Sequence, residues 1–173
     1  MKTPTHSLTT KRGVALVILL VTMVTVGVVG LAPATAADAQ IPFEAHITGA
    51  PAWTSPTTVE THGTGTATGV GRFTSSGQIV VDAPSGTCAN GTPALPNVQT
   101  ETLTAENGDQ LVLRIVAVAC QIAPQDFVGG GTWSVVSGTG RFEGMTGHGT
   151  VNGHCKFVPP DCEVDFVGTI SRP

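Results

Sequence analysis

The sequence contains the pattern G-x-G-R-F twice, at residues 69–73 and 138–142. A glycine-rich loop of this kind binds phosphate when it follows a strand and opens a helix, because the helix N-terminus then meets the anion. Here strand-like runs follow both copies, and neither copy is followed by the lysine of a P-loop. The pattern therefore predicts bends between strands, with Phe73 and Phe142 turned into the interior.

Cysteines are the next residues whose type suggests chemistry, and the chain has four: Cys88, Cys120, Cys155 and Cys162. An even number in an exported chain favours two disulfides, for which four cysteines allow three pairings. Zinc binding is the alternative use of four cysteines, but the chain has no C-x-x-C spacing. We therefore expect two disulfides and no metal site.

One pairing of the cysteines is supported by the residues around it. If Cys155 and Cys162 lie opposite each other across a turn at residues 158–160, the two strands sort into an apolar and a polar face. The apolar face holds the pairs Val151–Phe166 and Gly153–Val164, and the polar face holds His154–Glu163 and Asn152–Asp165. This consistency predicts a Cys155–Cys162 disulfide, and elimination leaves Cys88–Cys120.

A charged pair is expected in the hairpin around Asn107-Gly108, a dipeptide that favours a two-residue type I′ turn. In that register Glu101 faces Arg114, and an extra residue at the turn would shift the register. If this face lines an interior, the pair is a buried polar site; the alternative is a solvated surface pair. Trp53 and Trp133 either line a pocket or pack in the core; we favour the core for both, and Trp133, in the middle of a predicted strand, is the better pocket candidate. The candidate pocket residues are therefore Glu101, Arg114 and Trp133.

The remaining polar residues give no catalytic or metal-binding signal. The histidines at positions 46, 62, 148 and 154 lack the H-x-H and H-x-x-x-H spacings that place two side chains on one metal. Ser134 and Ser137 do not lie in a G-x-S-x-G elbow. We predict no catalytic residue, no metal ligand and no cofactor.

The elements that must position these residues are short strands. From Ile41 onward, β-branched and other apolar residues alternate with polar ones, and glycine, proline or asparagine interrupts the runs. Eight runs are expected, near residues 41–49, 60–71, 77–83, 98–105, 110–120, 130–137, 147–157 and 162–171. They predict an all-β domain, either an antiparallel up-and-down barrel or a sandwich. We favour the barrel, because closure leaves no unpaired sheet edge.

The first 36 residues have the features of a signal peptide. Three basic residues begin the chain, an uncharged apolar run covers residues 13–31, and small residues allow cleavage after Ala36 or after Ala39. An uncleaved membrane anchor is the alternative, because the apolar run is about long enough to cross a bilayer. We expect a secreted protein, with residues 1–36 as the signal peptide and one domain over residues 37–173.

The charge of this domain excludes two classes of partner. Residues 37–173 contain five basic and twelve acidic side chains, a net charge of −7 with neutral histidines. Nucleic acids and anionic lipid headgroups repel an acidic surface. We therefore predict no nucleic-acid partner and, after cleavage, no membrane partner.

Three stretches carry a resemblance to a known family: TLTAENGDQLVL at residues 102–113, GGGTWSVVSGTGRFEGMTGHGTVNG at 129–153 and DFVGTISRP at 165–173. They resemble small exported bacterial proteins that are similar to the allene oxide cyclase and dirigent barrels of plants. The resemblance implies an eight-stranded barrel with an apolar cavity, homo-oligomers and no cofactor. It carries over no catalytic residue, and the chain departs from the plant pattern in having no tyrosine.

Three functions follow from these observations. The first, which we favour, is a secreted, disulfide-stabilised barrel that binds a small apolar molecule without catalysis. The second is a cofactor-free cyclase (an isomerase) or a dirigent-type enzyme, with Glu101, Arg114 and Trp133 in its pocket. The third is a structural or surface-interaction protein whose barrel is filled by its own side chains. The shape of the interior distinguishes them.

Overall fold

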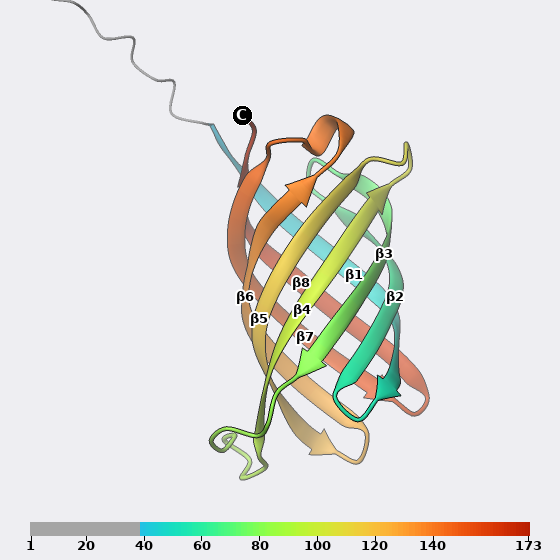
Figure 1. The fold of residues 1–173 in the computed structure, drawn as a ribbon, viewed down its shortest axis with the longest axis vertical. Helices are drawn as coiled ribbons and strands as arrows, with labels where there is room; N and C mark the ends of the chain where they lie inside the picture. Colours follow the sequence, from blue (N-terminus) through green and yellow to red (C-terminus); the bar gives the residue numbers. More distant parts are fainter. Residues whose placement is uncertain (1–38) are drawn as a thin grey trace, which may run out of the picture. The chain divides into compact units, whose positions relative to one another are not determined.

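The computed structural model describes residues 39–173, and these residues form one closed antiparallel β-barrel (Figure 1). Each strand pairs with the next strand in sequence, and the last pairs with the first. The predicted signal segment, residues 1–36, lies outside the described residues. The strands are β1 (Gln40–Ser55), β2 (Thr58–Ala67), β3 (Gly71–Val81), β4 (Ala94–Ala105), β5 (Gln110–Ala123), β6 (Asp126–Gly138), β7 (Thr146–Phe157) and β8 (Pro160–Ser171), with a short 3-10 helix, η1 (Gly140–Phe142), between β6 and β7.

The prediction of an eight-stranded up-and-down barrel is therefore confirmed for the described residues. Most strands begin earlier or end later than the sequence indicated; β1, for example, continues from residue 49 to Ser55 through Pro51. Proline interrupts a strand in most sequences because it cannot donate to the ladder, but Pro51 is paired with Thr61 here. No helix among residues 39–173 has the length and hydropathy needed to cross a membrane.

The barrel has two ends that differ in their connections (Figure 1). The connections β2–β3, β4–β5 and β6–β7 lie at one end together with the C-terminus, and we call this the closed end. The four other connections lie at the opposite end, which we call the open end. The two disulfides, Cys88–Cys120 and Cys155–Cys162, lie in or beside connections of the open end and confirm both predicted pairings.

Both G-x-G-R-F copies lie at the closed end, where they form turns as predicted. Gly69 and Gly71 have φ angles of +74° and +83° in the β2–β3 turn, a region that suits glycine. Arg141, from the second copy, joins the two: its guanidinium donates a hydrogen bond to the Val70 carbonyl at 2.5 Å. Its backbone N–H also donates to Asp109 Oδ2 at 3.1 Å. The repeated pattern therefore holds three turns of one end together.

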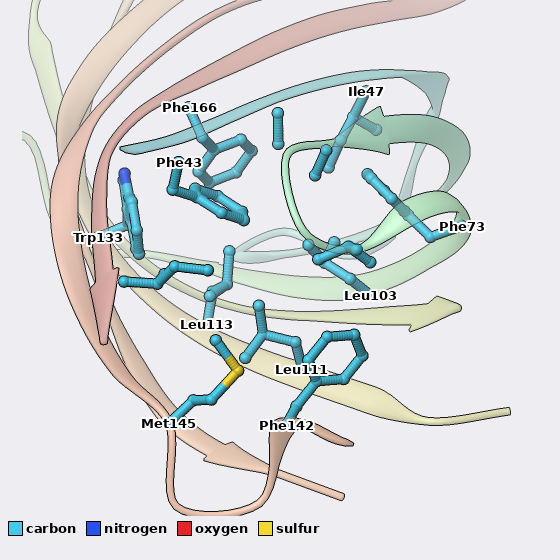
Figure 2. Packing of buried hydrophobic residues seen from close by; sticks show 14 of the residues in the cluster. Phe43, Ile47, Phe73, Leu103, Leu111, Leu113, Trp133, Phe142, Met145 and Phe166 are labelled. Carbon is cyan, nitrogen blue, oxygen red and sulfur yellow. The ribbon is translucent and has the colours of Figure 1, made fainter. Parts of the chain in front are cut away.

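Apolar side chains fill the interior next to the closed end (Figure 2). Phe73 and Phe142 are both buried there, as predicted from their place in the repeated pattern. The other large residues of this cluster come from every part of the chain: Phe43, Leu103, Leu111, Leu113, Ile115, Trp133, Met145, Phe166 and Ile170. This half of the barrel is thus a packed core.

Glycines opposite large side chains allow this packing. Trp133 on β6 is paired with Gly149 on β7, Gly149 with Gly168 on β8, and Gly168 with Phe43 on β1. Because the two glycines between them have no side chains, the Trp133 and Phe43 rings meet with centroids 5.0 Å apart. A Cβ atom at either glycine would lie 2.7 Å from the Trp133 indole. We call this arrangement a glycine row.

The structure confirms the predicted strand register in one of the two hairpins and contradicts it in the other. The β7–β8 hairpin has the predicted register, with Cys155 opposite Cys162 and Val151 opposite Phe166. The β4–β5 register is shifted by one residue, and the prediction that Glu101 faces Arg114 is wrong: Glu101 is paired with Leu113.

The turn explains the shift. Gly108 N–H bonds the Ala105 carbonyl and Ala105 N–H bonds the Asp109 carbonyl, so the loop has three residues, with Gly108 at φ +88°.

Candidate functional site

The half of the barrel next to the open end contains a cavity of about 130 Å³. It is partly open to solvent, and its inward-facing lining is mostly apolar. Small side chains on β5, Ala117 and Ala119, leave the space that large residues fill in the other half. The main apolar residues of the lining are Pro51, Val59, Ile79, Val81, Leu95, Ile115, Val151 and Val164.

Aromatic side chains surround the cavity at the open end. Trp53 stacks on Phe157 with ring centroids 5.2 Å apart, and Phe127 meets Phe157 edge-on at 5.7 Å. All three line the cavity. The Trp53 side chain is nevertheless 41% exposed, so its ring joins the cavity to the surface. An apolar molecule that enters from this end meets aromatic surface first.

A row of polar side chains follows the inner face of β4 away from this mouth. Asn97 and Gln99 line the cavity, and Glu101 lies next along the same face. Strand residues two apart share a face, so these three side chains point inward together. The row ends where Leu103 begins the packed core. The cavity is therefore apolar around most of its wall and polar along one strand.

Glu101 is the charged residue at the inner end of this row, and it is 2% exposed. Its Oε2 accepts hydrogen bonds from Gln99 Nε2 at 2.7 Å and from Thr61 Oγ1 at 3.1 Å. Its Oε1 is buried and has no partner among the described residues. Few buried polar atoms in proteins lack a partner, and each such atom costs free energy unless a ligand or water satisfies it.

A second glycine row, in which Gly77 is the single glycine, positions this carboxyl group. Thr61 on β2 is paired with Gly77 on β3, and Gly77 with Glu101 on β4. Glu101 reaches Thr61 by lying across Gly77, where a Cβ atom would collide with Oε2. The absence of a side chain at position 77 thus leaves the space that the carboxyl group occupies.

Burial is the main influence on the ionisation of Glu101. It raises the pKa of the carboxyl group above its ordinary value of 4.5, because a charge loses its hydration in the barrel interior. The hydrogen bonds from Gln99 and Thr61, the nearby Ser75 hydroxyl and the nearby His62 oppose this effect without cancelling it. Glu101 therefore keeps its proton at a higher pH than a glutamate in water does.

The carboxyl group lines a smaller inner cavity of about 50 Å³. This inner cavity and the larger one share Ile79, Gln99, Cys155 and Val164 in their walls. The Cys155–Cys162 disulfide lies on the side contributed by β7 and β8. The two cavities are therefore adjacent, one beside the aromatic mouth and the other beside Glu101, and we treat them together as the candidate site.

The structure separates the three pocket residues predicted from the sequence. Glu101 lies at the inner end of the site, but Arg114 is exposed on the outer face of β5, paired with Thr100. The one-residue register shift reverses the face of every β5 residue, which is why Arg114 does not accompany Glu101. Trp133 is 2% exposed in the packed core, where its indole N–H donates to the Val167 carbonyl at 3.3 Å.

Sequence reasoning missed Asn97, Gln99 and Phe157, and it favoured a core position for Trp53, which lines the cavity at its mouth. A signal for the polar row was present: polar residues at 97, 99 and 101 continue in phase with Leu103, which a two-residue period places on the same face. No signal indicated that Trp53 and Phe157 lie together, because they come from strands far apart in sequence.

The histidines lie outside this site or at its border. His46 bonds Asp165 Oδ1 at 2.7 Å, and His154 bonds Asp126 Oδ1 at 2.6 Å, all on exposed or half-buried side chains. Within residues 39–173, no three His, Cys, Asp or Glu side chains gather closely enough to hold a metal ion.

Comparison of the chain with models of protein families, with curated proteins and with solved structures gives no match.

Proposed function

We propose that the protein is a non-catalytic binder of one small apolar molecule, held in the cavity of the open half. The observation that carries this proposal is the cavity of about 130 Å³ with a mostly apolar lining in a barrel whose other half is packed. An apolar cavity of about 150 Å³ in another protein binds benzene, whereas pockets for drug-sized ligands hold about 300 Å³ or more. The expected ligand has the size of a single ring.

Two further features support the proposal. The stacked Trp53 and Phe157 rings give an entering apolar molecule a surface at the mouth. The disulfides are consistent with an oxidising compartment, and we propose that residues 1–36 direct secretion and that the ligand is met outside the cell. The resemblance to the allene oxide cyclase and dirigent barrels agrees with an apolar cavity and is itself part of this proposal.

Binding of methylenecyclohexane, an uncharged ring-sized probe, tests the proposal. We expect saturable binding by isothermal titration calorimetry, together with a change in tryptophan fluorescence, because Trp53 lines the cavity. Ala119→Phe should weaken binding more than tenfold, because the added ring occupies the cavity that Ala119 lines. Val116→Phe is the matched control: Val116 lies on the outer face of the same strand, 45% exposed, and this variant should bind as the wild type does.

Two results would contradict the proposal. The first is the absence of saturable binding by the wild type, and the second is equal loss of binding in the Ala119→Phe and Val116→Phe variants. Either would favour a structural or surface-interaction protein, for which the packed half of the barrel is the supporting observation.

One observation favours a second candidate, a cofactor-free cyclase or dirigent-type enzyme. Glu101 places a carboxyl group with a raised pKa at the end of an apolar cavity, as a general acid requires. An enzyme would release a rearranged product, whereas a binder would release its ligand unchanged. Mass spectrometry of the ligand that co-purifies with the protein, before and after prolonged incubation, distinguishes the two.

A further inference from the structure

We propose that the ligand carries an uncharged hydrogen-bond acceptor, a carbonyl or ether oxygen, and that Glu101 donates a hydrogen bond to it from Oε1. This inference rests on the proposed function and names the chemical class of its ligand. The site would therefore select ring-sized ketones, aldehydes, esters or ethers over hydrocarbons of the same shape.

The hydrogen bonds of Glu101 determine which oxygen carries the proton. Oε2 already accepts from two donors, the Gln99 amide and the Thr61 hydroxyl. A proton on Oε2 would compete with those donors, whereas Oε1 has no partner among the described residues. In the neutral acid the proton therefore lies on Oε1. An O–H group there is a donor with no hydrogen-bond partner among the described residues, and an acceptor on a ligand would satisfy it.

The charges around the site favour an uncharged ligand. His62 on β2 borders the inner cavity, but it is exposed and follows the inward-facing Thr61, and Cys155 and Cys162 are joined in a disulfide. Arg114 on the neighbouring β5 is exposed on the outer face. An amine bound as a cation beside Glu101 would form a buried ion pair, and burying both charges costs free energy that their attraction often fails to recover. A neutral acceptor and a neutral acid avoid this cost.

Access to Glu101 follows from the shape of the site. The cavity that begins at the aromatic mouth and the inner cavity that Glu101 lines share four wall residues. In the proposed complex, a ring-sized molecule in the larger cavity directs a single polar atom toward Oε1 and keeps its apolar atoms against the apolar wall. The second glycine row fixes the carboxyl group in that place, because Gly77 leaves it room.

Three probes of nearly the same size and shape test the inference: methylenecyclohexane, cyclohexanone and cyclohexylamine. We expect cyclohexanone to bind the wild-type protein at pH 5 about tenfold more tightly than methylenecyclohexane, as one satisfied buried hydrogen bond would give. Cyclohexylamine should bind more weakly than either. Tightest binding by the amine would overturn the inference and assign Glu101 as a carboxylate that binds cations.

Variants of Glu101 separate its role from that of the cavity. Glu101→Gln keeps an oxygen for the Thr61 and Gln99 donors and presents an N–H at the place of Oε1. It should therefore keep the preference for cyclohexanone. Glu101→Met should lose that preference and bind methylenecyclohexane at least as well as the wild type. Retention of the preference in Glu101→Met would contradict the inference.

The pH dependence provides a second readout. As pH rises through the raised pKa of Glu101, the wild type should lose its preference for cyclohexanone, because a carboxylate cannot donate. The preference in Glu101→Gln should stay constant over the same range. If methylenecyclohexane binds and cyclohexanone gains nothing at any pH, the inference fails while the proposed function stands. If no probe binds, the proposed function fails.

Discussion

Glu101 is held in the barrel interior by features of three neighbouring strands. Thr61 and Gln99 donate to one of its oxygens, and Gly77 leaves room for its side chain to cross β3. A buried carboxyl group with so few donors is destabilising when it ionises. Most of the remaining interior residues are apolar or glycine, so the burial of Glu101 has a cost in free energy that packing does not offset.

The stability of the protein should depend on pH through this residue. In the unfolded chain Glu101 ionises near its ordinary pKa of 4.5, whereas in the folded protein burial keeps it protonated to a higher pH. Well below pH 4.5 both states are protonated, and the ionisation of the group then has no effect on stability. As pH rises above 4.5 the unfolded state loses its proton first, so the free energy of unfolding falls until pH passes the raised pKa.

Glu101→Gln removes this dependence, because glutamine does not ionise. We expect the variant to gain stability relative to the wild type between pH 4 and pH 8, measured by urea denaturation at both values. A relative gain by the wild type on raising the pH would show that Glu101 is ionised and stabilised in the folded protein.

At the scale of the strand, the main organising feature is the glycine row. Trp133 and Phe43 meet over Gly149 and Gly168, and Glu101 reaches Thr61 over Gly77. In both rows, glycine on one strand makes room for a large side chain on its neighbour. Glycine in a strand is usually unfavourable, so its frequency in these strands reflects packing across the barrel rather than local preference.

Gly149→Ala should destabilise the protein by about 2 kcal/mol or more, because the new methyl group would lie 2.7 Å from Trp133 Nε1 and against the backbone of β8. Gly153→Ala is the matched control on the same strand and the same face. There the nearest atom to a Cβ would be Val164 Cγ2 at 3.3 Å, so the change should stay within about 1 kcal/mol. Urea denaturation of both variants measures the difference. Equal losses would show that the row does not limit packing.

The sequence supported the prediction of strands, barrel and disulfides but not the prediction of every register. In the β7–β8 hairpin, Cys155 and Cys162 fixed the pairing, and the apolar and polar faces agreed with it. In the β4–β5 hairpin, Asn107-Gly108 is compatible with a two-residue or a three-residue loop, and only the fold distinguishes them. One residue of difference moved Arg114 from the site to the surface. The sequence therefore allowed Glu101 to be predicted as a site residue, but it did not allow the residues around Glu101 to be predicted.

At the scale of the whole barrel, the two halves are stabilised by different means. The closed half contains the packed core, and the open half contains the cavity and both disulfides. A cavity lacks the dispersion contacts of a packed interior, and a covalent link restricts the unfolded chain instead. The disulfides thus support the half of the molecule that packing supports least.

The two disulfides should differ in their contribution. Cys88–Cys120 spans a sequence separation of 32 and Cys155–Cys162 a separation of 7. Loop-closure entropy therefore predicts losses of about 4 and about 2 kcal/mol for the paired Cys→Ala variants. Urea denaturation of both double variants measures these losses. A larger loss on removing the short link would indicate that Cys155–Cys162 acts through packing around the cavity rather than through chain entropy.

The pairing of β1 with β8 has a consequence for the order of folding. Gln40 pairs with Ser171 and Gly49 with Cys162, so the seam that closes the barrel joins the two ends of the described chain. Contacts between residues so distant in sequence form slowly, because a long loop must close before they contribute. Until β8 is in place, β1 and β7 are open edges that can pair with other chains. A chain that stops before residue 160 would therefore have an aggregation-prone open sheet in place of a barrel.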